Sequence, residues 1–130
     1  MIGNKWYKCD LHLHSTASEC FQDKTVTADE WVLACLQKGL DCVALTDHNT
    51  GDNIDDYKRV ADENGLIFFP GVEITCGDDG THLLVIFDRE ATSNTVNDFL
   101  ISVGIKREKF ASSLACSSNS VKKVIEAAAK

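Results

Sequence analysis

Residues 42–48 read Cys-Val-Ala-Leu-Thr-Asp-His, a short apolar run that ends in a polar pair. The apolar part, residues 42–46, lacks polar alternation, which is typical of a strand covered on both faces in a parallel sheet. Asp47 and His48 follow it directly. Because functional groups gather at the carboxyl ends of parallel strands, this pair indicates the edge of the sheet where a site is expected.

The segments on either side of this run predict helices. Before it, Thr27-Ala-Asp-Glu30 is a capping box that starts a helix, and Gly39 is a left-handed stop. After it, a turn cluster at 49–53 leads into apolar residues at helical spacing, and Gly65 ends that second helix. A strand with a helix on each side predicts crossover connections.

The rest of the chain extends this pattern. Further apolar runs predict strands at 6–13, 66–69, 72–75 and 82–87. Asp78-Asp79-Gly80 is a hairpin-type turn, since Asp-Gly favours a positive backbone angle. Helices are predicted at 92–104 and 118–130, with 105–117 ambiguous. Alternating strands and helices predict an α/β fold with parallel strands and outer helices.

Length and charge narrow the function classes. The 130 residues, 44% of them hydrophobic, match one domain over 1–130 with a real core. The 13 basic residues against 20 acidic ones give a net charge of −7, which disfavours a basic nucleic-acid face, so a bound phosphate needs a cation. The first residues contain no apolar run of signal-peptide length, and no later stretch approaches the roughly 20 apolar residues of a membrane helix, which predicts a cytoplasmic protein with no membrane partner.

The two chain ends and the cysteines add further expectations. The last predicted helix runs to Lys130 without a Gly or Asn cap, which indicates truncation and a downstream domain in a longer protein. Six cysteines without a CxxC pair or a secretion signal indicate reduced thiols. Cys35 and Cys42 lie in apolar segments and are expected to be buried, whereas Cys20 lies close to a histidine pair.

That histidine pair is the first candidate for metal binding. His12 and His14 lie two apart on a predicted strand, so they share a face and could reach one divalent ion. A His-x-His pair alone is more often structural than ligating. Here Asp10 precedes it, on the same face by alternation, and Glu19 follows in a loop.

Three more candidates follow later strands. His48 could ligate a metal, although the pair with Asp47 could instead cap a turn. Glu73 lies in an apolar segment, where a lone carboxylate is costly unless it is paired or coordinates a metal. His82 opens a strand and could equally be a structural histidine. Mixed His and carboxylate ligands suit Zn, Mn or Fe, and several of them permit neighbouring ions that clamp a phosphate.

Four motifs resemble, in order, the PHP (polymerase and histidinol phosphatase) domain family. They are Asp10-Leu-His-Leu-His-Ser-Thr16, Thr46-Asp-His-Asn-Thr50, Pro70-Gly-Val-Glu-Ile74 and His82-Leu-Leu-Val85. The resemblance covers about residues 6–90. It implies a (β/α)7 TIM-like barrel, incomplete here, with up to three Zn, Mn or Fe ions. It also implies hydrolysis of a phosphate ester, a small molecule or nucleotide, by metal-activated water.

The resemblance also implies residue roles. The implied metal ligands are His12, His14, Glu19, His48, Glu73 and His82, of which His48 and Glu73 are the catalytic candidates. Asp10 and Asp47 would orient these ligands. Glu19 stands where the family usually has Asp, and no His follows His82, so the chain holds about the first half of the site.

Several functions therefore remain open. The first is a phosphoesterase, with the activity of the 130-residue chain by itself in doubt. The second is a non-catalytic metal-binding or regulatory module of a larger protein, and the third is a hydrolase of a non-phosphate bond, because a fold does not determine a substrate. The opening Trp6 to Asp10 resembles PHP domains of large ATPase-linked proteins. A half barrel also leaves a strand edge exposed, which indicates a homo-oligomer.

Overall fold

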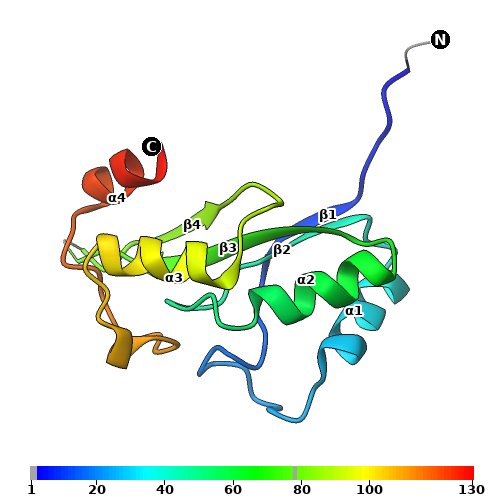
Figure 1. The fold of residues 1–130 in the computed structure, drawn as a ribbon, viewed down its shortest axis with the longest axis horizontal. Helices are drawn as coiled ribbons and strands as arrows, with labels where there is room; N and C mark the ends of the chain where they lie inside the picture. Colours follow the sequence, from blue (N-terminus) through cyan, green and yellow to red (C-terminus); the bar gives the residue numbers. More distant parts are fainter. Residues whose placement is uncertain (1–2, 78) are drawn as a thin grey trace.

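Four strands form one curved sheet in the order β1-β2-β3-β4 (Figure 1). The computed structural model describes residues 3–77 and 79–130. The strands are β1 Cys9–Leu13, β2 Cys42–Leu45, β3 Ile67–Thr75 and β4 His82–Ile86. The first three run parallel and β4 runs antiparallel to β3, because a link of 76–81 is too short for the crossover that a parallel neighbour needs. The predicted α/β class and the incomplete barrel are confirmed.

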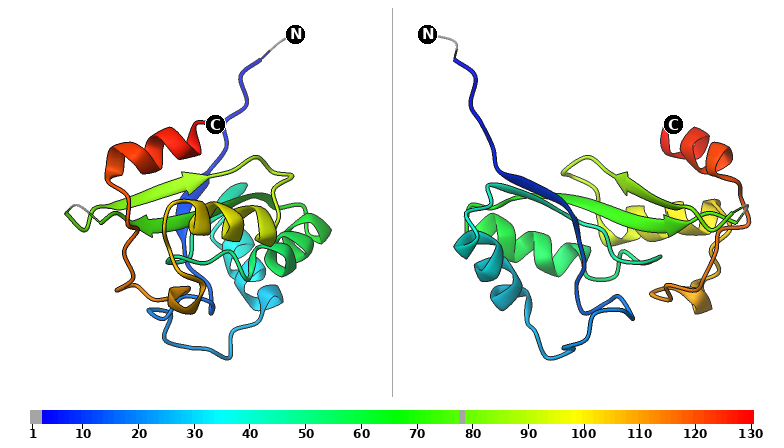
Figure 2. Two further views of the ribbon diagram at one scale, coloured as in Figure 1. Left: turned by 60° about the vertical axis from the view of Figure 1, so that its left-hand side comes forward. Right: turned by 180° about the vertical axis from the view of Figure 1, so that it is seen from behind.

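The helices lie outside this sheet. They are α1 Ala28–Gln37, α2 Ile54–Glu63, α3 Ser93–Ser102 and α4 Val121–Ala128, with a short 3-10 helix η1 at Arg107–Lys109. α1, α2 and α3 lie on one side of the sheet, and α4 lies at its β4 end (Figure 2). Across residues 3–77 and 79–130, none of the helices has the length and apolar character that crossing a membrane requires.

Short sequence patterns correctly predicted where the first two helices begin or end. The predicted capping box is present, with the Glu30 amide donating to the Thr27 hydroxyl and the Thr27 amide donating to the Glu30 carboxylate. Gly39 and Gly65 both have φ of +73°, the left-handed conformation expected after a helix. Gly80 has φ of +74° as a hairpin turn requires, whereas Asp78 of the same predicted turn lies outside the described residues.

Other boundaries differ from the prediction. β1 begins at Cys9 rather than at residue 6, because β2 begins at Cys42, opposite Cys9, and gives earlier residues no strand to pair with. The predicted strand at 66–69 and the extended segment expected to continue it at 72–75 form one strand, β3, which starts at Ile67 and runs through Pro70. α4 starts after Ser120, whose hydroxyl accepts the Lys123 amide, and so leaves residues 118–119 outside the helix.

One face of the sheet forms the core with the helices. Its residues alternate along β2 and β3 and are at most 1% exposed: Val43, Leu45, Phe68, Val72 and Ile74. Residues between them, such as Glu73, face the other side of the sheet, since side chains alternate along a strand. The six cysteines all lie among the described residues and form no disulfide, and Cys35 and Cys42 are buried as predicted.

Candidate metal centre

Glu73 lies at the centre of a cluster of four imidazoles. Its side chain is only 6% exposed, and Oε2 lies 3.0 Å from Nε2 of His12, 3.2 Å from Nε2 of His14 and 3.5 Å from Nδ1 of His48. Oε1 lies 2.7 Å from Nδ1 of His82. β4 runs antiparallel, so its first residue meets the same sheet edge as the last residues of β1 and β2. The structure therefore brings His12, His14, His48 and Glu73, which were expected at this edge, together with His82.

Backbone hydrogen bonds continue past the end of β2 and hold residues 47–49 against β3. The Glu73 amide donates to the Asp47 carbonyl at 3.0 Å, and the Asn49 amide donates to the Glu73 carbonyl at 3.0 Å. Asn49 has φ of +49°, and its side-chain amide donates to the carbonyls of Ser112 and Ala115. The segment that carries His48 is therefore attached to β3 on one side and to the loop at 112–115 on the other.

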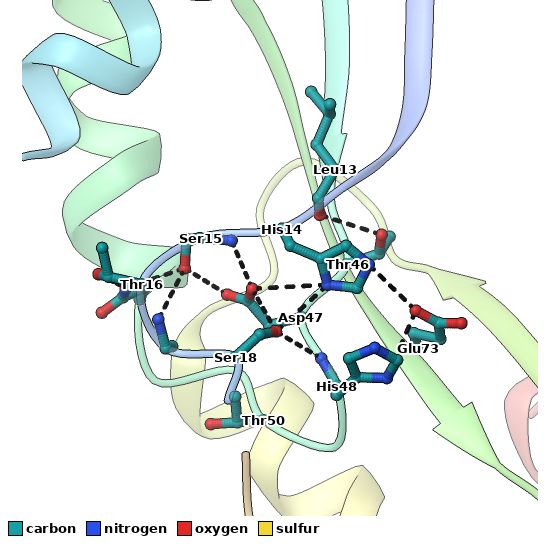
Figure 3. A network of polar contacts seen from close by, with 12 residues as sticks. Leu13, His14, Ser15, Thr16, Ser18, Thr46, Asp47, His48, Thr50 and Glu73 are labelled. Atoms are coloured by element: carbon teal, nitrogen blue, oxygen red, sulfur yellow. Dashed lines mark hydrogen bonds and ion pairs between the residues drawn. The ribbon is translucent and has the colours of Figure 1, made fainter. Parts of the chain in front are cut away.

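Asp47 is buried below the imidazoles and organises the loop that follows β1. Its carboxylate accepts the Ser15 amide at 2.6 Å, the Ser15 hydroxyl at 2.5 Å and the Ser18 hydroxyl at 2.8 Å (Figure 3). Burial raises the pKa of Asp47, and the hydrogen bonds from Ser15 and Ser18 oppose that shift. Asp47 thus has a structural role, and it reaches the imidazoles chiefly through Ser18.

Ser18 determines which nitrogen of His14 carries a proton. Its hydroxyl donates to Asp47 and accepts the His48 amide at 2.9 Å, so the 3.2 Å contact with Nδ1 of His14 requires that Nδ1 donate. Burial, followed by the neighbouring His48, lowers the pKa of His14, which favours the neutral ring. A neutral ring protonated at Nδ1 directs the lone pair of Nε2 toward Glu73.

This arrangement fits a cation. Burial by itself would raise the pKa of Glu73, but hydrogen bonds with His12 and His82 outweigh it and lower that pKa, so the carboxylate is ionised. Nε2 of His14 and Oε2 of Glu73 then face each other as two acceptors 3.2 Å apart. Nδ1 of His48 is also buried and has no hydrogen-bond partner among the described residues. A divalent ion would satisfy these three atoms together, since histidine nitrogen and carboxylate oxygen are common zinc ligands.

Three groups of donor atoms in the described part of the chain could each hold an ion. They are His12, His14 and Glu73; His48, Glu73 and His82; and His14, Cys20 and His48, with the donor atoms of each group within 4.8 Å of one another. Glu73 belongs to two of these groups. Ligation by these residues stays a prediction.

Two predicted site residues lie elsewhere. Glu19 is exposed and belongs to none of these three groups, while its backbone amide donates to the Ala111 carbonyl at 3.2 Å. Asp10 does not share the face of the histidines, because β1 contains one extra residue between the pairs Asp10–Val43 and Leu13–Leu45. Its carboxylate accepts the backbone amide of His12 at 3.1 Å and so supports the strand rather than a ring.

Sequence reasoning assigned no role to Ser15 and Ser18. Both lie in the polar loop that follows His14, and Ser18 follows it at a spacing of four residues. Short hydroxyl side chains in such loops commonly bond nearby backbone and side-chain groups, so the loop composition was the available signal. Their partner Asp47 lies about 30 residues away in the chain, and only the fold shows that pairing.

The family model of the PHP domain matches residues 10–128, so this chain belongs to the PHP domain family. A 5′-3′ exoribonuclease from Haemophilus influenzae is 35% identical over 79 residues, which are 61% of this chain and 27% of that protein.

Two solved structures are also similar to this chain. A protein from Bifidobacterium adolescentis assigned as a metal-dependent phosphoesterase aligns with a TM-score of 0.56 and 26% identity over 75% of this chain and 33% of its own. A two-domain protein from Bacteroides vulgatus, with a domain predicted to be a PHP-like metal-dependent phosphoesterase, aligns with a TM-score of 0.53 and 27% identity over 62% of this chain and 26% of its own.

An amidohydrolase from Chromobacterium violaceum, with bound sulfate and no metal, shares the fold with a TM-score of 0.56 and 24% identity over 78% of this chain and 34% of its own. The chain thus spans about a quarter to a third of the length of the proteins that it matches.

Proposed function

We propose that this chain forms part of a metal-dependent phosphoesterase of the PHP type, with its ions held around Glu73. The observation that carries this proposal is the pair of facing acceptors, Nε2 of His14 and Oε2 of the buried Glu73, in a cluster with three more imidazoles. Two acceptors at that distance repel each other unless a cation lies between or beside them. The family membership and the structural relatives support the reaction class.

Each residue has a distinct part in this proposal. A bound divalent cation supplies polarisation of a phosphoryl oxygen and a more acidic water. His12, His14 and Glu73 would hold one ion, and His48, Glu73 and His82 would hold a second. The His12 and His82 side chains are 51% and 45% exposed, so they form the open rim through which a phosphate ester reaches the buried carboxylate.

The proposed metal is Zn, Mn or Fe, because mixed imidazole and carboxylate ligands suit these ions better than Ca or Mg. The proposed substrate is a small phosphate ester or a nucleotide, and the activity of the Haemophilus relative favours the nucleotide class. The net charge of −7 agrees with a phosphate bound through cations rather than through a basic surface. A cytoplasmic location, a downstream domain and an ATPase-linked parent protein belong to the same proposal.

The test measures metal content and turnover in parallel. The chain is loaded with Zn, Mn or Fe, its bound metal is counted by elemental analysis, and hydrolysis of an aryl phosphate, 5′-nucleotides and a short oligoribonucleotide is followed. We expect bound metal that Glu73→Gln removes, and weak hydrolysis by this chain, because about half of the family's ligands are present. Absence of bound metal in the folded wild-type chain would contradict the proposal.

Stoichiometric metal without turnover of any phosphate ester has a different meaning. It would favour the alternative of a non-catalytic metal-binding module. Hydrolysis of an amide without hydrolysis of a phosphate ester would favour the other alternative function, a hydrolase of a non-phosphate bond.

A further inference from the structure

We propose that Cys9 and Cys42 form a redox-sensitive dithiol, which a low-molecular-weight disulfide oxidises to a reversible disulfide between β1 and β2. The two residues begin these strands, so the pair lies at the amino edge of the sheet, opposite the edge of the proposed metal centre. The inference is therefore independent of the proposed function. The two cysteines are distant in the chain, and only the fold brings them together.

The first observation is the strand register. Cys9 pairs directly with Cys42 in the parallel ladder of β1 and β2. Residues that pair in this way project their side chains to the same face of the sheet. Neighbouring strands lie about 4.7–4.9 Å apart, and disulfides join residues whose α-carbons are roughly 4.4–6.8 Å apart. The backbone therefore already provides the spacing that a disulfide needs.

The second observation is that the two thiols share one hollow in the surface. Cys9 and Cys42 line a cavity of about 240 Å³ together with Tyr7, Ile67 and Phe69. Ile67 of β3 pairs with Cys42, which continues the same face across the sheet. Cys9 is exposed, whereas Cys42 is only 7% exposed. A dissolved oxidant therefore meets the Cys9 thiol first.

The third observation is contact between the two thiols. Burial, followed by a hydrogen bond with Cys9, raises the pKa of the Cys42 thiol to about 11. A hydrogen bond between two thiols requires that their sulfur atoms are adjacent. The Cys9 thiol in turn donates to the Tyr7 carbonyl at 3.7 Å. Because the thiolate is the nucleophile, Cys42 reacts poorly with a dissolved oxidant, but its position beside Cys9 suits it to attack a disulfide formed there.

The reaction consists of two thiol–disulfide exchanges. The Cys9 thiolate attacks one sulfur of the small disulfide, so that a bond to Cys9 forms, the bond within the oxidant breaks and one small thiolate leaves. Cys42 then loses its proton and attacks the Cys9 sulfur. This step forms the bond between Cys9 and Cys42 and releases the second small thiolate. The protein loses two electrons and two protons, and the oxidant gains them as two small thiols.

The geometry also makes the bond easy to reduce. Side chains of directly paired residues in parallel strands project side by side rather than toward each other, so closing the bond requires a small shift of the strands. Strained or exposed disulfides are the more readily reduced ones. This agrees with the reduced thiols that the sequence predicts, since disulfides of reducing compartments are usually transient and redox-sensing.

The experiment exposes the folded chain to oxidised glutathione, digests it without reductant and maps its disulfides by mass spectrometry. We expect a linked pair of peptides, Cys9 with Cys42, in a chain that stays monomeric on a non-reducing gel, and loss of the link after dithiothreitol. In Cys42→Ala, Cys9 should stop at a mixed disulfide with glutathione, at least about 10-fold more abundant than in the wild-type chain. Cys116→Ala is the matched control, since Cys116 is exposed and lies in a loop, and it should keep the link.

A second measurement needs no variant. The wild-type chain is equilibrated at a series of glutathione redox ratios, denatured and alkylated, and the blocked fraction of each cysteine is measured. We expect Cys9 and Cys42 to be blocked in equal fractions at every ratio, because one bond blocks both. A blocked fraction of Cys9 that exceeds that of Cys42 throughout the series, or a link from Cys9 to any other cysteine, would overturn the inference.

Discussion

The two faces of this sheet differ sharply, although the same strands build both. On the helix-covered face, Phe68 and Val72 are at most 1% exposed. On the opposite face, Leu84 and Ile86 are 40% and 41% exposed, and Glu73 is buried only because imidazoles surround it. The difference indicates that hydrophobic burial on one face stabilises the fold. The other face, the chemical face, carries the proposed metal centre around Glu73. Substitutions on the two faces should therefore affect different measurements.

The largest expected effect is on the covered face. Phe68→Ala should lower the free energy of unfolding by about 3–5 kcal/mol, because it leaves a cavity in the core beneath Trp31. The control is Phe69→Ala, one residue further along β3 on the other face and only partly buried, which should cost clearly less. Urea denaturation measures both. Equal losses would show that the two faces contribute alike.

The next effect is on the chemical face and concerns metal rather than stability. Glu73→Gln should weaken metal binding by at least about 100-fold, equivalent to about 2.7 kcal/mol, because a neutral amide replaces the carboxylate shared by two ligand groups. Calorimetric titration with zinc measures the change, and circular dichroism checks the fold. Undiminished affinity in a folded Glu73→Gln variant would show that ions bind away from this face.

Asp47 is buried and bonds to Ser18, which contacts His14. Its removal should therefore lower both the free energy of unfolding and the affinity for metal. Asp47→Ala leaves the amide and hydroxyl of Ser15 and the hydroxyl of Ser18 without their acceptor, which should cost about 2 kcal/mol. Metal affinity should also fall, by about 10–100-fold, because Ser18 positions His14 and His48. Asp10→Ala is the matched control and should do less, since the Asp10 carboxylate accepts a hydrogen bond from the backbone amide of His12 rather than from a side chain of the site. A larger effect of Asp10→Ala would refute this assignment.

The smallest expected effect is on the open part of the chemical face. Leu84→Ala should change the free energy of unfolding by less than about 1 kcal/mol, because the side chain is already 40% exposed and leaves no closed cavity. Thermal denaturation at several protein concentrations measures it. A large loss that depends on concentration would instead show that a second copy covers this face, as the predicted homo-oligomer would require.

Local structure was predictable wherever neighbours in the chain determine it. The capping box at Thr27 and Glu30 and the left-handed glycines at 39 and 65 are present, since each depends on contacts within a single turn. The period of apolar residues likewise separated helices from strands. The ends of elements were less predictable, because β1 can only begin where β2 offers it a partner.

The site was predictable in part for the same reason. His12, His14, His48 and Glu73 were placed by their positions at strand ends, which a parallel sheet brings to one edge. His82 opens its strand and meets them only because β4 runs antiparallel to β3. Asp10 and Glu19 were expected beside them from spacing alone. A single extra residue in β1 turns Asp10 to the other face, and the anchored loop leaves Glu19 outside the ligand groups of the described residues.

The sequence by itself determined the class of fold, the edge of the sheet where the candidate site lies and four of the residues that meet there, His12, His14, His48 and Glu73, because periodicity and strand ends are local properties of the chain. Tertiary structure alone decided that the Ser18 hydroxyl accepts a hydrogen bond from Nδ1 of His14, that Cys20 rather than Glu19 approaches His48, and that β4 returns His82 to Glu73. These contacts depend on strand register and loop anchoring between residues distant in sequence, which no local pattern specifies.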